Sequence, residues 1–457
     1  MGRTYIVEDV VEGYLTKQCE QTAGPVSGLL IGQSSTQREY VVTATRTPQR
    51  EESTASGGNS PDKEWVTEHA RQVSRMLPGG LSVLGVFIVT DTDAKDTLTT
   101  LRQLVFAVEN LISSERLWTS AEDDVSDRVV LHVNPKTRKT LCRTFDVKDP
   151  KSVAKPADWK YQSGVCSSWS TVSCCVSVDV LLPLPDNPTA TEDTAKCLKV
   201  SARAQKAPQF VVGGGVLRLC FLQEGLRGWA HQLESAVCLI DGRRLAADAE
   251  LAGGQKRNVR QTYSAQLLIT PDERRLAEGV QRCGGSVSVS GAVYSTAYLH
   301  SNKPKARQAE KLLKRDAVST LTTRAQMLLE ELLTSGGASE GSSRDEHQRE
   351  QFCLPHRVFC PVEASGPVCV CDYRFSDEGL SEVIDRLKEM LDMDAAEKDL
   401  DIRRETPAEV LEGDAADEPT VETAEALQSK RNYFGAAMAT TVALLATAAS
   451  MLYLNDV

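Results

Sequence analysis

The sequence lacks several short motifs that identify common protein classes. It has no Gly-x-x-x-x-Gly-Lys loop, which argues against a P-loop nucleotide-binding protein. It has no Cys-x-x-Cys pair, so a zinc knuckle with ordinary ligand spacing is absent. It also has no basic stripe with interleaved aromatic residues, and this argues against nucleic acid as a partner.

The N-terminus lacks a secretory signal, because Glu8, Asp9 and Glu12 interrupt any apolar run in the first twelve residues. The thirteen cysteines show no disulfide framework spacing, and in a chain that faces the cytosol they are expected to be reduced. With 41% hydrophobic and 25% charged residues, the composition is that of a globular protein. The length before the C-terminal apolar stretch, about 430 residues, predicts two or three domains.

A long uncharged stretch lies near the C-terminus, from Tyr433 to Leu454. Its 22 residues would reach roughly 33 Å as a helix, against a hydrocarbon core of about 30 Å. Lys430 and Arg431 precede it, so the positive-inside rule places the bulk of the chain in the cytosol. The pattern predicts a single transmembrane helix at 433–454, acting as a tail anchor. A buried core helix is the alternative.

The stretch before this helix is strongly acidic. Between residues 394 and 425 there are 12 acidic and 3 basic residues, which accounts for -9 of the net charge of -11. Because such a run repels itself and offers little apolar surface to bury, it favours a solvated chain. We predict an acidic disordered tether over 394–432.

Residues 1–150 alternate between strand and helix patterns, which predicts an α/β domain. The predicted strands are 5–7, 26–32, 40–45, 81–90, 128–133 and 140–145. The predicted helices are 8–18, 65–77 and a third with Leu101, Val105, Val108 and Ile112 on one face. A Pro78-Gly-Gly80 turn separates the second helix from the buried strand at 81–90.

Residues 151–393 predict a second, β-rich domain. Helix signals are sparse in its first part, where the extended segments are 168–184, 215–222, 235–240, 264–269 and 286–299. A long helix at 304–333, with Leu313, Ala317 and Leu321 on one stripe, closes its core. Two strands at 357–362 and 368–375 and a final helix at 379–392 follow. The whole is thus a multidomain chain of mixed α+β and α/β class.

One cluster of residues could carry chemistry. Within 19 residues lie Cys353, His356, Cys360, Cys369 and Cys371, enough in principle for four zinc ligands. The spacing is poor, and Cys369 and Cys371 alternate along a predicted strand, so ordinary hairpin packing is the favoured interpretation. No cysteine is paired by pattern with a particular histidine, and therefore no cysteine peptidase site is indicated.

Several segments resemble the odorant response abnormal protein 4 family, and the resemblance covers nearly the whole chain. They are residues 1–8, 26–33, 44–48, 64–80, 156–164, 358–359 and 371–375 and the terminal hydrophobic segment. The resemblance implies an endoplasmic reticulum membrane protein that assists maturation or trafficking of a subset of G-protein-coupled receptors. It also implies partnership with the cysteine peptidase specific for the ubiquitin-fold modifier, which the family would tether to that membrane. The family resemblance implies no catalytic residues in this chain.

The N-terminal domain also resembles an MPN domain, through Gly28-Leu-Leu-Ile-Gly32 and the strand before Gly85. Active members hold a catalytic zinc with a His-x-His pair just after such a strand. Ile88 and Thr90 stand at the corresponding positions here, and neither side chain binds zinc. The resemblance implies a pseudoenzyme that lacks the metal ligands; an unrelated α/β layout with the same strand order is the alternative.

Two functional hypotheses of different classes follow. The favoured one is a non-enzymatic membrane adaptor with no catalytic, cofactor-binding or metal-binding residues and no small-molecule substrate. The alternative is a membrane-tethered hydrolase that uses a cysteine or a zinc at the Cys353–Cys371 cluster. The alanine-rich span followed by Asp456 favours the endoplasmic reticulum over the mitochondrial outer membrane.

Overall fold

In a computed structural model, most of the chain before residue 406 is described, and contacts group Met1–Glu405 into one compact unit. The described residues are 2–21, 24–35, 38–49, 61–118, 124–185, 209–212, 215–251, 261–269, 283–300, 303–336, 353–363 and 366–405. The predicted transmembrane helix at 433–454 lies outside them. Among the residues described, no helix combines the length and the apolar character needed to cross a membrane.

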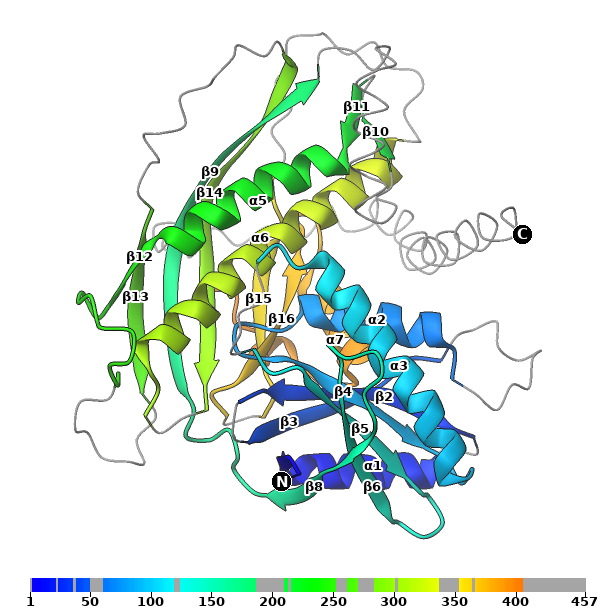
Figure 1. Cartoon of the computed structure of the whole chain (residues 1–457). Helices are drawn as coiled ribbons and strands as arrows, with labels where there is room; N and C mark the ends of the chain where they lie inside the picture. The colour runs from blue at the N-terminus through cyan, green and yellow to red at the C-terminus, as the bar shows by residue number, and fades with distance from the viewer. Residues whose placement is uncertain are drawn as a thin grey trace, which may run out of the picture. The chain divides into compact units, whose positions relative to one another are not determined.

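The first half of the chain builds a mixed sheet of eight strands in the order β7-β6-β5-β4-β2-β3-β1-β8 (Figure 1). The strands are β1 (Thr4–Glu8), β2 (Val26–Gln33), β3 (Glu39–Arg46), β4 (Ser82–Val89), β5 (Asp127–Val133), β6 (Thr140–Asp146), β7 (Lys155–Pro156) and β8 (Asp158–Gln162). The strand order brings β8, from beyond residue 150, beside the N-terminal strand β1 in parallel register. The sheet therefore extends past residue 150.

Helices cover both faces of this sheet, because its central strands are apolar on both sides. On β4, Val86 and Ile88 join one core cluster, whereas Phe87 and Val89 join another. The first cluster includes side chains of α2 (Lys63–Arg75), α3 (Ala94–Glu115) and α7 (Leu380–Leu391), and the second includes α1 (Asp9–Gln21).

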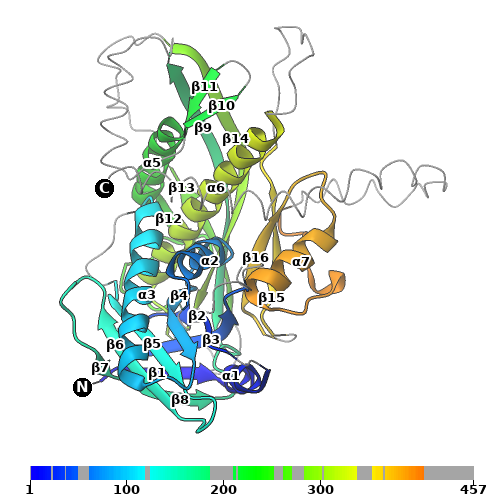
Figure 2. The ribbon, with the colours of Figure 1, turned by 90° about the vertical axis from the view of Figure 1, so that its right-hand side faces the viewer.

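The second half is organised around a long antiparallel pair of strands, β9 (Ser170–Pro185) and β14 (Cys283–Leu299). With β12 (Val237–Ile240) and β13 (Thr262–Leu268) they form a four-stranded sheet in the order β12-β13-β9-β14. Helices α5 (Leu219–Ser235) and α6 (Ala306–Gly336) run along this sheet in both views (Figure 2). Two small hairpins complete the described strands: β10 (Gln209–Val212) with β11 (Gly215–Arg218), and β15 (His356–Pro361) with β16 (Cys369–Arg374).

The structure confirms the mixed α/β class, the long helix predicted at 304–333 and the final helix predicted at 379–392. The prediction that 215–222 is extended was wrong from residue 219 on, because α5 begins at Leu219. Its buried residues Leu226, Trp229, Ala230 and Leu233 follow helical spacing, but neighbouring glycines weakened that signal. The MPN-like assignment stays a prediction.

The start of the acidic stretch differs from the prediction as well. Residues 394–405 contain a short 3-10 helix, η2 (Glu397–Asp399), and Asp401 pairs with Phe359 of β15 through two backbone hydrogen bonds of 2.8 and 3.1 Å. The tether predicted to begin at 394 therefore overlaps an ordered segment that continues to Glu405. Burying Phe359 beneath this segment explains why so polar a sequence is held in place.

Candidate functional site

The turn between α2 and β4 joins the two sheets at very short range. Gly79 donates its backbone N–H to Thr296 and accepts a hydrogen bond from the N–H of Tyr298, both on β14. A Cβ on Gly79 would lie 2.7 Å from the carbonyl oxygen of Leu312, and one on Gly80 would lie 2.3 Å from that of Tyr298. Gly80 also has a φ of +87°, which favours glycine. Glycine is therefore required at positions 79 and 80 by this contact.

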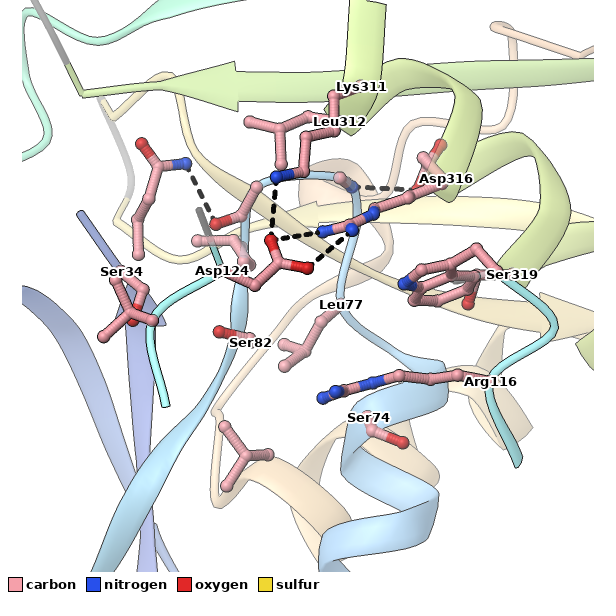
Figure 3. A pocket seen from close by; sticks show the side chains of 18 of the residues that line it. Ser34, Ser74, Leu77, Ser82, Arg116, Asp124, Lys311, Leu312, Asp316 and Ser319 are labelled. Atoms are coloured by element: carbon pink, nitrogen blue, oxygen red, sulfur yellow. Dashed lines mark hydrogen bonds and ion pairs between the residues drawn. The ribbon is translucent and has the colours of Figure 1, made fainter. Parts of the chain in front are cut away.

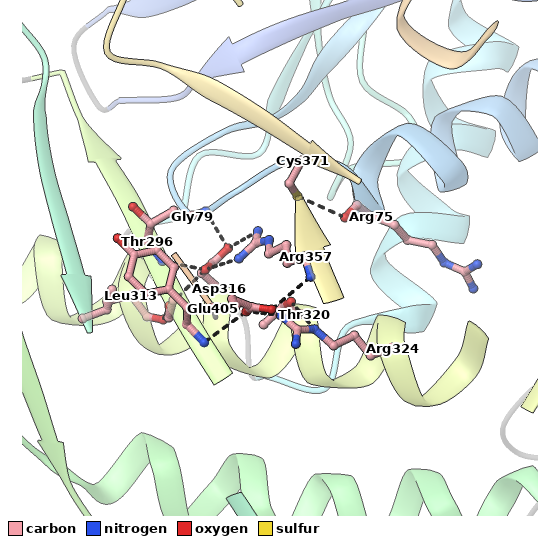
Figure 4. Close-up of polar contacts among 12 residues, drawn as sticks. Arg75, Gly79, Thr296, Leu313, Asp316, Thr320, Arg324, Arg357, Cys371 and Glu405 are labelled. Atoms are coloured by element: carbon pink, nitrogen blue, oxygen red, sulfur yellow. Dashed lines mark hydrogen bonds and ion pairs between the residues drawn. The ribbon is translucent and has the colours of Figure 1, made fainter. Parts of the chain in front are cut away.

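Beneath the turn, Asp316 of α6 accepts five hydrogen bonds (Figure 4). Two come from the guanidinium of Arg357 on β15, at 2.8 and 2.9 Å, and the others from Gly79 N, Thr296 N and Ser295 Oγ. The side chains of Asp316 and Arg357 are each only 1% exposed. Burial opposes the charge of Arg357, but Asp316 holds its pKa well above the usual value. This pair fixes α6, β14, β15 and the turn to one another.

A second buried ion pair lies beside the first. Glu405 pairs with Arg324 of α6, and both side chains are 5% exposed. The Glu405 carboxylate also accepts the backbone N–H groups of Arg357, at 2.9 Å, and Tyr294, at 3.2 Å. Glu405 is thereby attached to α6, β14 and β15 at once.

A cavity of about 1340 Å³ opens next to this junction (Figure 3). It is lined by the start of β3, the end of α2 and the glycine turn, the end of α3, and the face of α6 from Lys311 to Gln326. Arg116, just after α3, extends into it toward Leu77 and Ser74. The cavity lies at the N-terminal end of β4, and its lining includes Ser82 and Val83.

The lining is strongly cationic, with ten Arg or Lys residues and five Asp or Glu residues. Asp124 binds Lys311 at 2.8 Å and also Arg315, through two bonds of 2.7 and 3.0 Å. Glu109 likewise binds Arg116 at 3.2 Å and Arg128 at 2.8 Å. Each of these carboxylates is thus shared by two cations, which leaves an excess of positive charge in the cavity.

Arg75, at the end of α2, contributes a buried guanidinium to the same wall. It is 9% exposed; its Nη2 donates to the amide oxygen of Gln326 at 2.9 Å, and its buried Nε has no hydrogen-bond partner. Glu330 approaches Nη1 only to 3.8 Å and is 54% exposed. Burial lowers the pKa of Arg75, and the neighbouring Arg71 lowers it further. Arg75 is a charge that the protein alone compensates poorly.

The structure separates the residues of the Cys353–Cys371 cluster. Cys353 and His356 are exposed, whereas Cys360, Cys369 and Cys371 are buried in the β15–β16 hairpin. In the register of the hairpin Cys371 lies opposite Phe359, and Cys360 lies opposite Val370. Burial raises the pKa of Cys360 and of Cys371 to about 11, so both thiols are protonated at neutral pH and lack the thiolate that a peptidase requires.

Ile88 and Thr90, the positions that correspond to MPN zinc ligands, lie at the other end of β4 from the cavity. Ile88 packs in the apolar core beneath α2 and α3. Thr90 bonds to Thr92 at 3.1 Å, and His132 of β5 donates its Nε2 proton to the Thr90 carbonyl oxygen at 3.1 Å. These positions are filled by core packing and a local hydroxyl network.

In the described part of the chain, a different trio brings possible ligand atoms within 4.8 Å of one another: Glu8, Cys166 and Glu363. The Glu8 carboxylate already accepts the backbone N–H groups of Gly164 and Val165, both at 2.6 Å. Burial, with the two carboxylates, raises the pKa of Cys166 to about 12. The observed role of Glu8 is to anchor the loop after β8.

Sequence reasoning missed the cavity, since its cations come from segments between residues 38 and 315 and form no run. It also passed over Gly337-Ala-Ser-Glu-Gly341, which has the spacing of a serine nucleophile elbow. An elbow needs a preceding strand, whereas this stretch follows helix α6, and it lies outside the described residues. The only sequence signal for the cavity is the Pro78-Gly-Gly80 turn at its edge.

The amino-acid sequence is similar to those of several known proteins. The sequence model of the odorant response abnormal 4-like family matches residues 28–209 and 220–402. The protein odr-4 homolog of Homo sapiens is 40% identical over 485 residues, with all of both chains covered. The protein of the same name in Mus musculus is 39% identical over 483 residues, also with full coverage of both. That of Dictyostelium discoideum is 32% identical over 107 residues, 20% of this chain and 24% of that protein.

Among solved structures, the crystal structure of UfSP from C. elegans is similar at a TM-score of 0.37 and 9% sequence identity. The match covers 86% of this chain and 57% of that chain. A likeness of this degree does not establish a shared fold.

Proposed function

Because this chain belongs to the odorant response abnormal 4-like family, we propose that it is a non-enzymatic adaptor at the endoplasmic reticulum membrane. The observation that carries the proposal is the 40% identity over the complete length of the human odr-4 homolog. In this role the chain tethers the cysteine peptidase specific for the ubiquitin-fold modifier and assists maturation or trafficking of a subset of G-protein-coupled receptors.

The chemistry of the described residues supports a binding role over a catalytic one. The thiols of Cys360 and Cys371 are buried and protonated at neutral pH. Residues 88 and 90 carry no imidazole. A cavity beside α6 is lined by ten Arg or Lys side chains against five Asp or Glu side chains, a balance that suits the binding of an anion.

The sequence supports membrane attachment, through the uncharged stretch 433–454 behind an acidic linker. In the proposed arrangement, the body that ends at Glu405 lies in the cytosol and the linker gives it reach from the membrane surface. A peptidase bound to that body would be concentrated at the membrane without any covalent link to it.

Deletion of residues 433–457 tests the tethering role. The shortened chain should still bind the peptidase, but membrane fractionation of cells that make only this form should find the peptidase in the supernatant. A peptidase that stays with the membranes in those cells contradicts the proposal. A matched control deletes 337–350, a polar stretch far in sequence from the anchor, and should leave the peptidase on membranes.

Metal analysis of the purified protein separates the adaptor from a zinc hydrolase. The adaptor hypothesis expects less than stoichiometric zinc, unaltered by Cys360→Ala or Cys371→Ala. Stoichiometric zinc that both substitutions remove would support the hydrolase instead.

A further inference from the structure

The cavity beside α6 concentrates positive charge on a protein that is acidic overall. Its lining carries twice as many cations as anions, whereas the whole chain has a net charge of -11. Two of its carboxylates, Asp124 and Glu109, are each shared by two cations, as described above. A site with this balance attracts an anionic ligand and disfavours a cationic one.

Two guanidinium groups in the cavity lack a carboxylate partner of their own. Arg75 is nine-tenths buried, has an unpartnered Nε and bonds chiefly to the neutral amide of Gln326. Arg116 points into the cavity (Figure 3), and its partner Glu109, at 3.2 Å, is shared with Arg128. Burial lowers the pKa of Arg116, and the opposing effect of Glu109 does not cancel this because Arg128 and Arg315 lie nearby. Bringing a carboxylate to either group would relieve the cost of holding these charges close together.

The positive charge is spread along a line. Lys311 and Arg315 stand near one end of the lined face of α6, and Gln326, the partner of Arg75, stands at the other. Lys311 and Gln326 are fifteen positions apart on one helix, which is about 22 Å. An extended peptide covers that distance with about six or seven residues. A single phosphate group would reach only one end.

The volume and the walls also suit a peptide. At about 1340 Å³ the cavity is larger than the roughly 300–1,000 Å³ typical of small-molecule pockets. Apolar side chains line the cavity as well as cations: Leu77, Ile112, Leu117 and Trp118. Arginine and neighbouring apolar surface together recognise acidic segments that carry an apolar side chain.

We propose that this cavity binds an extended acidic peptide segment of a partner protein, with carboxylates pairing with Arg75 and Arg116 and an apolar side chain packing near Leu77 and Trp118. The inference concerns the cavity alone, and it holds whether or not the chain tethers a peptidase at a membrane.

Fluorescence anisotropy with the full chain in detergent tests the proposal. The probe is a fluorescein-labelled peptide of about eight residues that alternates Glu and Leu, and the control probe replaces every Glu with Gln. The acidic probe should bind, the Gln probe should bind at least about tenfold more weakly, and affinity for the acidic probe should fall as salt rises.

Charge-removing variants locate the site. Arg116→Gln and Arg75→Gln should each lower the affinity for the acidic probe about tenfold. Lys160→Gln, at an exposed position on β8, should leave that affinity unchanged. Arg116 is 28% exposed, so Arg116→Gln carries the test if the buried Arg75→Gln variant does not fold.

Four results would overturn the proposal. The first is no binding of the acidic probe, and the second is equal binding of the Glu and Gln probes. The third is an affinity for the acidic probe that Arg116→Gln leaves unaltered. The fourth is that inositol hexakisphosphate binds in an Arg116-dependent way and the peptide does not, which would make the cavity a site for a phosphorylated small ligand. None of these assays contains a membrane or a peptidase, so their failure leaves the adaptor role standing.

Discussion

Removing the carboxylate of Asp316 is the most direct test of how the two sheets are held together. In Asp316→Ala, the guanidinium of Arg357 keeps its burial but loses both of its bonds to the carboxylate, and Thr296 N loses its acceptor on Asp316. The cation–π contact of Arg357 with Phe359, at 5.0 Å, remains but is too weak to replace an ion pair. The variant therefore leaves a nearly uncompensated charge in the core.

The expected loss of stability in Asp316→Ala follows from the hydrogen bonds of Asp316 and from the desolvation of the two buried ions. Five hydrogen bonds to a charged group, at about 1.5–3 kcal/mol each, would total roughly 8–15 kcal/mol, which is as large as the whole stability of a typical protein. Much of that sum offsets the desolvation of two ions. Breaking a buried pair from one side costs about 3–5 kcal/mol, and we expect Asp316→Ala to fall in this range.

Urea unfolding of residues 1–405, followed by tryptophan fluorescence and circular dichroism, measures this loss. Adding Arg357→Met to Asp316→Ala should recover at least about 1 kcal/mol, since the uncompensated cation is then gone. Asp158→Asn removes one partner of an exposed pair with Lys160 and should change stability by less than about 0.5 kcal/mol. The reasoning fails if Asp316→Ala costs less than about 1 kcal/mol, or if the double variant loses the sum of the two single losses.

Three further predictions concern the turn, a buried histidine and Glu405. Gly80→Ala should destabilise the protein by roughly 2–4 kcal/mol, because residue 80 has a positive φ and a Cβ there would clash with Tyr298. Gly228→Ala, in an open position on α5, should instead stabilise the protein by about 0.5–1 kcal/mol. Thermal unfolding measures both changes, and equal effects would contradict the packing argument. Burial lowers the pKa of His69 to about 4, although the hydrogen bond that it donates to the Met390 carbonyl at 2.8 Å acts in the opposite direction. The unfolded chain takes up a proton at His69 near pH 6.5, whereas the folded chain does not, so the free energy of unfolding should fall by about 2 kcal/mol between pH 7 and pH 5 because of this group. In His69→Gln, the urea midpoint should therefore decline less over the same pH range. Glu405→Gln should accelerate amide hydrogen exchange over residues 397–405, while Asp394→Asn, at an 85% exposed position, should not; identical exchange in both variants would argue against the Arg324 pair as the anchor.

Where local periodicity determined structure, the sequence predicted it. Leu313, Ala317, Leu321 and Ala325 form the buried stripe of α6, as their spacing indicates. Helix α5 was missed because glycines lie within an otherwise regular pattern. A glycine lowers helix propensity by about 1 kcal/mol, but packing of Trp229 and Leu233 into the second core outweighs that cost.

The candidate site could not have been predicted in the same way. Asp316 looks like one more polar residue on a helix, and only the fold brings Arg357 and Gly79 to it from 41 and 237 positions away. The cations of the cavity are likewise distant in sequence, and the net negative charge of the chain conceals them. Long-range electrostatic pairs have no periodicity, so a single sequence carries almost no signal for them.

The attachment of Glu405 also decides where the chain can be shortened. Composition alone suggests a cut after Met393, at the last residue before the acidic run. Such a fragment would lose the two backbone bonds between Asp401 and Phe359, and it would leave Arg324 buried without its carboxylate. A fragment for crystallisation or binding work should therefore end after Glu405, and loss of solubility in the shorter one would reflect an exposed Phe359 and not a misplaced domain boundary.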